Sequence, residues 1–398
     1  MAARFVLCLT LASGLLASSA AFAQNGTPIN PNSGNRLTLA VYGDSPYGLT
    51  PTDTTQTDKT ASFVAAINAD PKVDLVLHVG DIHSGKQYCT EAYDRTIADL
   101  WGAFKNPLIY TPGDNEWTDC HKAGEGGHVR AGGLPVDYAD GDPLANLQLV
   151  RSLFFPVPGV SLGGRKKQLL TQAQWFDPAF PTDSQYLENV IWEQSKVLFV
   201  VLNVPGGSNN DGDDWFGQPR TQAQTDEIAQ RSGADLRWLT TAFARARQDG
   251  VEAVVIQLQA DMWDLDSKAT THLSNYEPLI AAIAADTAAF GKPVLLLNGD
   301  SHHYRSDNPL KGRQPCVFES GTGTDTKSCS AIPAAIDFTP DAWTNHPAYN
   351  VPNFHRIVVH GSTEPFEWLR LTISPGTNQP ASANGFGPFS WERIQTAP

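Results

Sequence analysis

The chain has 398 residues, 41% of them hydrophobic, and a formal net charge of −14 at pH 7. This length allows one large domain or two ordinary ones, and this composition excludes a chain that is mainly disordered. The excess of acidic residues argues against a broad surface for nucleic acid or for anionic membranes, so we expect neither as a partner.

The first 23 residues have the three parts of a secretory signal peptide. Arg4 provides the basic start, Phe5 to Leu16 the apolar stretch, and Ala21 to Ala23 a small-residue cleavage site. The apolar stretch is too short to span a bilayer, and no later apolar run is long enough. We therefore predict a signal peptide at 1–23, a single domain at 24–398, and export to a periplasmic or extracellular space without a membrane span.

Four cysteines follow the predicted signal peptide, and an even number in an exported chain suggests two disulfides. Of the three possible connectivities we predict the local one, with Cys89 bonded to Cys120 and Cys316 bonded to Cys329. Zinc binding by the thiols is the alternative, although their spacing contains no C-x-x-C pattern.

The first part of the predicted domain alternates apolar runs with helical stretches, which is typical of an α/β protein. We expect strands at 37–42, 73–79 and 108–111, with helices at 58–70 and 90–104. The segment from about 118 to 185 is rich in glycine, proline and isolated aromatic residues, and we interpret it as an irregular insertion.

The same alternation continues after the insertion. A strongly apolar hairpin at 189–204 is followed by an amphipathic helix at 233–250. The tail from about residue 375 is rich in Pro, Gly, Ser and Asn, so we expect a loop or a terminal strap there. The other expected elements are a strand within 251–263, a helix at 276–293, and strands at 294–300, 356–361 and 367–374.

Five of the apolar runs end in polar residues that can bind a metal ion or phosphate. They end at Asp44, Asp81, Asp114 with Asn115, Gln259, and Asp300 to His302. In open α/β sheets ligands bind outside the carboxyl ends of the strands, where residues from distant parts of the chain meet. These side chains are therefore predicted to share one site.

The order of these motifs resembles the calcineurin-like metallophosphoesterase superfamily. The series is Gly-Asp at 43–44, Gly-Asp at 80–81, G-x-N-E at 113–116, an apolar strand with a polar end, and G-x-x-H at 299–302. The predicted export favours the purple-acid-phosphatase-like side of the superfamily, and the resemblance covers roughly residues 36 to 373. It implies an α/β (α+β) fold, a four-layer α/β/β/α sandwich in which two mixed β-sheets are flanked by helices.

The resemblance also implies a metal site at the strand ends. The activity that the resemblance implies is hydrolysis of a small-molecule phosphate mono- or diester by metal-activated water. Carried over position by position, the metal ligands are Asp44, Asp81, Asp114 or Asn115, Gln259, Asp300 and His302.

Several histidines of the family pattern are replaced in this chain. Pro46, Asn115 and Asp300 stand at three histidine positions, and Gln257 or Gln259 stands at a fourth. The remaining set suits one divalent ion, or an oxygen-rich pair such as Mg, Mn or Ca, better than two Zn or the Fe site of a typical purple acid phosphatase. Ser84 also replaces the tyrosine of the purple centre.

Further residues near the motifs are candidates for catalysis and substrate binding. His83 can take the proton-transfer role of the missing histidine, Asn115 occupies that histidine's position, and Arg305 can clamp a phosphate oxygen. Asn203 and Asn209 follow the most apolar strand and can donate hydrogen bonds to phosphate.

Two hypotheses of different classes follow from these motifs. The first is an exported metal-dependent phosphoesterase. The second, favoured by the missing imidazoles, is a catalytically impaired protein of the same fold that binds a ligand or a partner.

Overall fold

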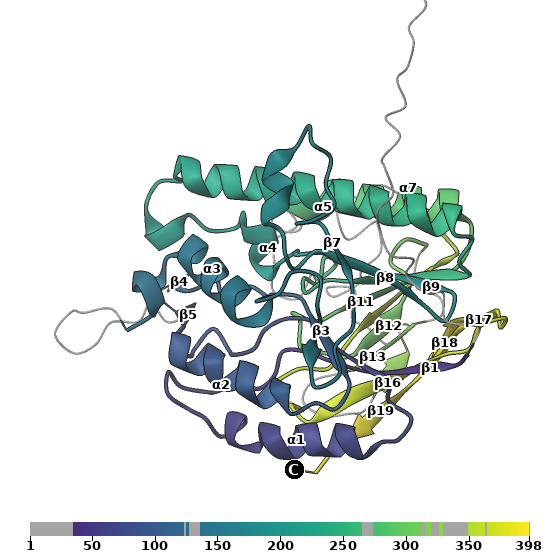
Figure 1. Ribbon diagram of the computed structural model, residues 1–398, viewed down its shortest axis with the longest axis horizontal. Coiled ribbons are helices and arrows are strands. Elements are labelled where there is room, and N and C mark those ends of the chain that lie inside the picture. Colours follow the sequence, from purple (N-terminus) through teal and green to yellow (C-terminus); the bar gives the residue numbers. More distant parts are fainter. Residues whose placement is uncertain are drawn as a thin grey trace, which may run out of the picture.

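The computed structural model describes residues 35–122, 125–126, 136–264, 274–311, 316–319, 326–328, 349–362 and 364–397. Their elements form four layers, with two β-sheets in the middle and helices on both outer sides (Figure 1). The predicted signal peptide and Cys329 lie outside the described residues, so the signal peptide and the second disulfide stay predictions.

The first sheet has the strand order β17-β18-β19-β16-β1-β2-β3-β6. It is mixed, because β1, β2 and β3 run parallel whereas β16 runs antiparallel to β1. Helices α1, α2 and α3 pack on its outer face through Phe63, Trp101 and Phe154. The bounds are Leu37–Tyr42 (β1), Leu75–His78 (β2), Pro107–Tyr110 (β3), Leu162–Gly163 (β6), Glu367–Ile373 (β16), Gln379–Ser382 (β17), Gly385–Gly387 (β18), Phe389–Gln395 (β19), Thr57–Ala69 (α1), Glu91–Gly102 (α2) and Pro143–Phe154 (α3).

The second sheet has the order β14-β13-β12-β15-β11-β10-β9-β8-β7. Its central strands β9, β10, β11 and β15 run parallel, and α5 and α7 cover its outer face. The bounds are Leu170–Thr171 (β7), Val190–Gln194 (β8), Val197–Val201 (β9), Ala253–Gln257 (β10), Val294–Asn298 (β11), Arg305–Asp307 (β12), Val317–Glu319 (β13), Thr326–Ser328 (β14), Phe354–Val358 (β15), Gln222–Gln248 (α5) and Glu277–Phe290 (α7). The small elements β4 (His121–Lys122), β5 (Glu125–Gly126) and α4 (Gly206–Asn210) lie outside both sheets.

The central strands are buried on every residue and are mostly apolar, because both of their faces are covered. In β1, Leu39 and Val41 face the second sheet, whereas Ala40 packs under the helices of the first. Phe199 and Val200 of β9 divide in the same way between the two faces of the second sheet. Continuous apolar runs are the usual composition of such doubly covered parallel strands, and the predicted two-sheet sandwich is confirmed.

The C-terminal segment differs from the loop-rich tail that we expected. It forms β17, β18 and β19, and β19 pairs along the whole of β16. Phe389 and Trp391 alternate with Ser390 and Glu392, so the first two enter the core between the sheets while Glu392 is exposed. The surrounding glycines and prolines hid this short period-2 pattern.

Two further elements differ from the sequence interpretation. The expected insertion contains the three-turn helix α3, whose first turn is capped by Asp142, and it also supplies β6 and β7, one edge strand for each sheet. Helix α5 begins at Gln222 because Thr221 caps it by accepting from the Gln224 N–H. Its first turns are mostly exposed, so they carry no apolar stripe that predicts a helix.

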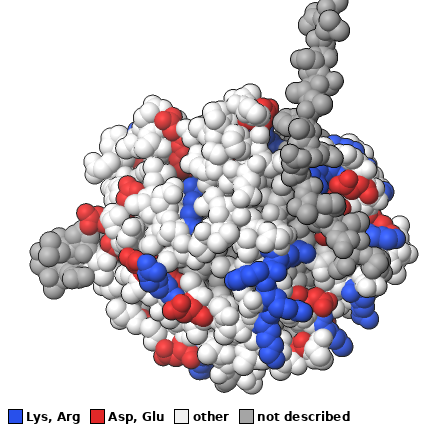
Figure 2. Space-filling model, in the orientation of Figure 1, with Lys and Arg blue, Asp and Glu red and all other residues white. Residues whose placement is uncertain are grey.

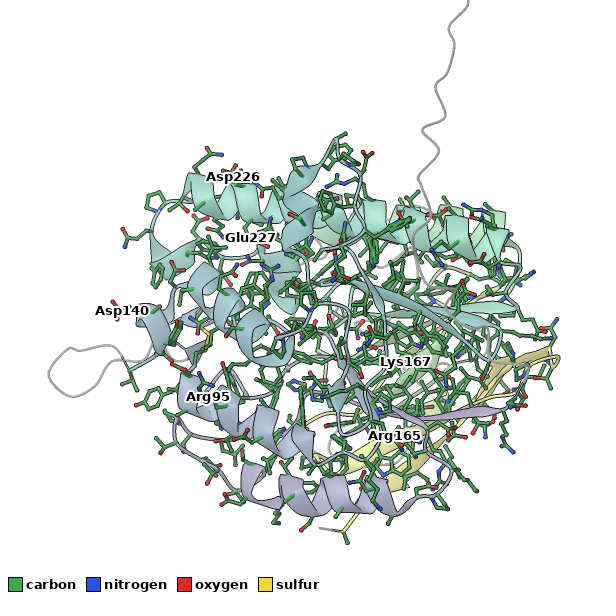
Figure 3. All side chains as sticks on the ribbon, viewed as in Figure 1. Arg95, Asp140, Arg165, Lys167, Asp226 and Glu227 are labelled. Carbon is green, nitrogen blue, oxygen red and sulfur yellow. A yellow bond between two sulfur atoms is a disulfide. The ribbon has the colours of Figure 1, made fainter. Side chains whose placement is uncertain are left out.

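Charged side chains of both signs are interspersed on the face shown in Figure 2. A basic group lies near its lower centre, where Figure 3 labels Arg165 and Lys167. No helix in the described ranges has both the length and the apolar character needed to cross a membrane. The expectation that no surface binds nucleic acid stays a prediction.

We predict that Phe389→Ala lowers the free energy of unfolding by about 3–5 kcal/mol, because the ring is fully buried between the sheets. Denaturant unfolding measures this change. Glu392→Ala on the same strand is the matched control, since its carboxylate forms an exposed ion pair with Arg370 and such pairs contribute no more than about 1 kcal/mol. Equal effects of the two variants would contradict a core role for β19.

Candidate metal centre

The carboxyl ends of β1, β2 and β11 bring three metal-binding side chains together. Asp44, Asp81 and His302 each place one ligand atom within 4.8 Å of the others. His302 Nε2 lies 3.6 Å from Asp44 Oδ1. Among the described residues this is the one group of three or more His, Cys, Asp or Glu side chains with such spacing.

The backbone holds these side chains in an unusual conformation. The φ angles are +49° at Asp44, +60° at Asp81, +74° at Asp300 and +61° at His302. Left-handed backbone costs a residue other than glycine about 1–3 kcal/mol, and such residues concentrate at functional sites. Four of them around one point indicate that the loops are shaped to aim these side chains.

Two glycines of the motifs make room for the neighbouring aspartates. A Cβ atom at Gly113 would lie 1.9 Å from Asp81 Oδ1, and one at Gly299 would lie 2.3 Å from Asp44 Oδ2. Gly113 and Gly299 are thus each required by the aspartate of another motif, which links the motifs in space.

The electrostatics of the cluster favour a cation. Burial, followed by the nearby Asp300 carboxylate, raises the pKa of Asp44 well above its usual value. Burial and the charges of Asp114 and Glu116 do the same to the pKa of Asp81. Asp44 Oδ2 is buried with no hydrogen-bond partner among the described residues. Oxygen-rich sites of this kind fit a divalent ion.

Asp81 is held by three side chains from different loops. Tyr47 Oη donates to Asp81 Oδ2 at 2.7 Å, Asn115 Nδ2 at 2.9 Å and Gln259 Nε2 at 3.3 Å. Burial and the Asp81 charge raise the pKa of Tyr47 well above its usual value, so the hydroxyl stays protonated and donates. Sequence reasoning missed Tyr47, and an aromatic residue directly after Pro46 was its only signal.

His302 is oriented by residues that the motif series does not include. Its Nδ1 lies 3.4 Å from Ser362 Oγ, which leaves Nε2 directed toward Asp44. The ring also packs edge-on against the Tyr47 ring, with centroids 5.2 Å apart. Ser362 lies in the loop after β15, so three loops fix one imidazole.

Asp300 connects the cluster to a buried group of charged side chains. Its N–H donates to Asp44 Oδ1 at 2.9 Å, and its Oδ2 accepts from the Asp261 N–H at 3.0 Å. Asp261 in turn accepts from Arg356 at 2.5 Å and from Arg305 at 3.3 Å. Although burial acts in the opposite direction, these two arginines lower the pKa of Asp261.

Arg305 therefore does not occupy the position that we predicted. Its guanidinium is buried on β12, 3.3 Å from Asp261 and 3.8 Å from Asp264. A cavity of about 870 Å³ opens beside Asp81 and His302, and Arg305 does not line it. A buried cation remains next to buried carboxylates because separating the two charges is costly. Arg305 is linked to the site through Asp261, whose N–H donates to Asp300.

His83 also lies away from the cavity wall. Its Nδ1 is 3.0 Å from the Ser84 carbonyl oxygen, and its ring packs edge-on against Tyr93. The side chain is almost fully buried. This position does not support the proton-transfer role that we predicted, because a general acid must reach the substrate.

Asn203 and Asn209 are joined to each other by an arginine and do not line the cavity. Arg231 of α5 donates to Asn209 Oδ1 at 2.5 Å and to the Asn203 carbonyl oxygen at 3.3 Å. Asn203 Nδ2 donates to Glu188 at 2.8 Å. Arg231 also donates to the Asn209 carbonyl oxygen at 2.9 Å, and Asn209 lies in the left-handed turn of α4 (φ +61°).

The structure separates two alternatives that the sequence left open at the fourth motif. Gln257 Nε2 donates to the His78 carbonyl oxygen at 2.8 Å, so it belongs to the packing between the sheets. Gln259 Nε2 instead donates to Asp114 Oδ1 at 2.9 Å, inside the cluster. Both candidates of the third motif, Asp114 and Asn115, face the cavity.

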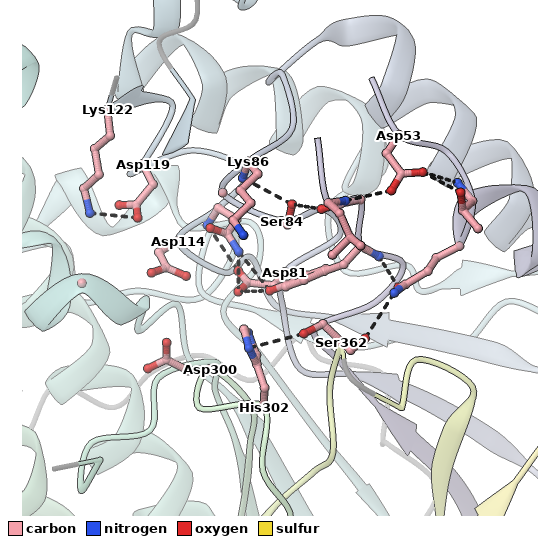
Figure 4. A pocket seen from close by; sticks show the side chains of 18 of the residues that line it. Asp53, Asp81, Ser84, Lys86, Asp114, Asp119, Lys122, Asp300, His302 and Ser362 are labelled. Carbon is pink, nitrogen blue, oxygen red and sulfur yellow. Dashed lines mark hydrogen bonds and ion pairs between the residues drawn. The ribbon is translucent and has the colours of Figure 1, made fainter. Parts of the chain in front are cut away.

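A cavity of about 870 Å³ opens beside the cluster (Figure 4). Asp81, Asp114, Asp300 and His302 face one another across its floor. Lys122 lies at its wall, 2.9 Å from Asp119 and 3.1 Å from Asp213. The volume suits a small-molecule ligand.

The predicted Cys89–Cys120 disulfide is confirmed. Both sulfur atoms lie close to the Asn115 carbonyl oxygen, at 3.4 Å for Cys89 and 3.6 Å for Cys120. The bond therefore ties the loop after β2 to the loop that carries Asp114 and Asn115.

A comparison with family models identifies the class to which the chain belongs. The model of the calcineurin-like phosphoesterase family matches residues 37–240, just over half of the chain. The chain therefore belongs to the calcineurin-like phosphoesterase family. No curated protein matches it.

Among solved structures the chain is similar to purple acid phosphatase PPD1 from seeds of yellow lupin (Lupinus luteus). The identity is 12% and the TM-score 0.36, and the match covers 86% of this chain and 50% of that one. The chain thus spans about half the length of that enzyme.

We predict that Gly113→Ala weakens binding of a divalent ion at least about tenfold, which corresponds to about 1.4 kcal/mol, because the new methyl group must displace the Asp81 carboxylate. Isothermal titration calorimetry measures the affinity. Gly102→Ala at the end of α2 is the control, since its Cβ meets nothing within 4 Å. Unchanged affinity in Gly113→Ala would show that Asp81 does not bind the ion.

Proposed function

We propose that the protein is an exported metal-dependent phosphoesterase that hydrolyses a small phosphate mono- or diester. One observation carries this proposal: Asp44, Asp81 and His302 converge within 4.8 Å, and two of them, Asp81 and His302, line a cavity of about 870 Å³. The membership of the chain in the calcineurin-like phosphoesterase family supports the reaction class.

Asp44, Asp81 and His302 are the proposed ligands. Asn115 and Asp300 hydrogen-bond to Asp81 and Asp44 and orient them, and Asp114 shares the Gln259 amide with Asp81. The chemistry that a divalent ion contributes to such sites is polarisation of a phosphoryl oxygen and activation of water. The mixed oxygen and nitrogen ligands are compatible with Mg, Mn, Ca, Fe or Zn, and favour the harder ions of that series.

The remaining residues of the cavity have positioning roles in this proposal. Tyr47 holds both Asp81 and the His302 ring in place. Lys86 and Lys122 are the basic residues among the described residues that line the cavity, so they are the proposed contacts for the anionic phosphate. Lys122 is already directed by Asp119 and Asp213.

Export is supported by the Cys89–Cys120 disulfide and by the signal-like first residues. Disulfides persist in oxidising compartments and are rare in the cytosol. Localisation of the full chain by fractionation, with and without residues 1–23, tests this part of the proposal.

A second function, ligand or partner binding without catalysis, is favoured by one specific observation. His302 is the one imidazole among the described residues that line the cavity, and amide groups of Asn115 and Gln259 occupy the other side of Asp81. Apart from the proposed ligand His302, no histidine among the described residues that line the cavity is then available to donate a proton to a leaving group.

We predict that the purified protein hydrolyses chromogenic phosphate mono- or diesters in the presence of a divalent ion. Asp81→Asn should reduce kcat/KM by at least about 100-fold, since loss of even an outer partner of a metal site costs about 10–100-fold. Asp140→Asn, on an exposed turn, is the control with unchanged activity. Absence of hydrolysis with every ion, despite bound metal, would favour the binding function instead.

We also predict that a divalent ion stabilises the folded chain. At a free concentration of about 100 times Kd the gain is about 2.7 kcal/mol, because the ion neutralises buried carboxylates that repel one another. Thermal unfolding with the ion and with a chelator measures the shift. His302→Gln should reduce it, whereas Glu392→Ala should not.

A further inference from the structure

We infer that the site holds a single divalent ion, between Asp44, Asp81 and His302, and that the carboxamide of Gln259 occupies the opposite side of Asp81 in place of a second ion. The inference rests on the metal binding proposed above. It goes beyond that proposal by assigning the number of ions and the residue that sets this number.

The orientation of the Gln259 amide is fixed by the backbone. Its Oε1 accepts from the Gly206 N–H at 2.5 Å. A backbone N–H can only donate, so the oxygen must face Gly206 and the nitrogen must face the other way. Gln259 is fully buried between these groups, and a flip of its amide would leave the Gly206 N–H unsatisfied at a cost of about 1–3 kcal/mol.

The amide nitrogen therefore faces two carboxylates. Nε2 lies 2.9 Å from Asp114 Oδ1 and 3.3 Å from Asp81 Oδ2. Its two hydrogens satisfy one oxygen of each aspartate, which is what a shared cation would otherwise do. An amide nitrogen that carries two hydrogens has no free electron pair for a metal, so Gln259 cannot serve as a ligand in this orientation.

Asn115 adds to the same arrangement. Its Nδ2 lies 2.9 Å from Asp81 Oδ2, and its backbone N–H lies 3.2 Å from Asp81 Oδ1. Nδ2 also donates to Tyr47 Oη at 2.9 Å. Since Tyr47 Oη itself donates to Asp81, its oxygen is available to accept this bond. Asp81 Oδ2 thus accepts from three side-chain donors, those of Tyr47, Asn115 and Gln259.

Gly206 limits the remaining space between Asp114 and Asp300. The position of a Cβ atom at Gly206 lies 2.6 Å from Asp114 Oδ2 and 2.7 Å from Asp300 Oδ1. Both carboxylates therefore lie directly against the backbone of α4 at Gly206. The other oxygen of Asp300, Oδ2, accepts from the Asp261 N–H. Asp114 and Asp300 do not join with a third described His, Cys, Asp or Glu side chain into a group with metal-ligand spacing.

The ion count can be measured without reference to activity. The full chain is stripped with a chelator and titrated with Mn²⁺, followed by elemental analysis and electron paramagnetic resonance. We expect one Mn²⁺ per chain and the hyperfine-split spectrum of an isolated ion. Two Mn²⁺ per chain with exchange coupling would overturn the inference, whereas no bound Mn²⁺ would instead remove the proposed function.

The role of Gln259 has its own test. Gln259→Glu replaces the donating NH2 group by an oxygen ligand and a negative charge, so the count should rise from one Mn²⁺ to two. Gln248→Glu, the same change at an exposed position at the end of α5, should leave the count at one. A folded Gln259→Glu variant that still binds one ion would show that the amide does not set the number of ions.

Discussion

The repulsion among buried carboxylates is the constraint on which the rest of the site depends. Asp44, Asp81, Asp114 and Asp300 converge at the ends of strands from the two sheets, and burial raises the pKa values of Asp44 and Asp81 because it makes their negative charges expensive. Neighbouring groups donate hydrogen bonds to these carboxylates: backbone N–H groups, the Tyr47 hydroxyl and the amides of Asn115 and Gln259. Asp44 Oδ2 is a buried oxygen that accepts no hydrogen bond from the described residues. A cation fits beside this oxygen.

The fold makes this concentration of charge possible. The parallel strands β1 and β2 place Asp44 and Asp81 side by side, and the loop after β11 reaches them from the second sheet. Behind the loops, Arg356 bridges Asp261 and Asp307, so charges that hold the site are themselves neutralised by buried partners. The apolar layers on the faces of the sheets stabilise the fold. The strand ends can therefore hold polar side chains.

The sequence was sufficient for the parts of the site that follow strands. Asp44, Asp81, Asp300 and His302 could be predicted because each closes an apolar run, and strand ends meet. Tyr47, Ser362 and Asp261 could not, because their roles depend on which loops pass one another in space. Asn203, Asn209 and Arg305 were assigned to phosphate by residue type, yet each is held by a charged partner far along the chain: Glu188, Arg231 and Asp261.

The same limit applies to the fold. Long apolar runs predicted the central strands, whereas β19 was missed because Phe389 and Trp391 stand among glycine and proline. Only the pairing of β19 with β16 shows that these rings complete the core.

The contact between Ser45 and Pro365, whose Oγ and carbonyl oxygen lie 2.8 Å apart across 320 residues of sequence, has a consequence for biosynthesis. The loop of the first ligand is completed by a segment that is synthesised about 320 residues later, and β1 has β16 as its second neighbour. Pairings between such distant segments form slowly. We therefore expect the geometry around Asp44 to be completed only when β16 is available to pair with β1.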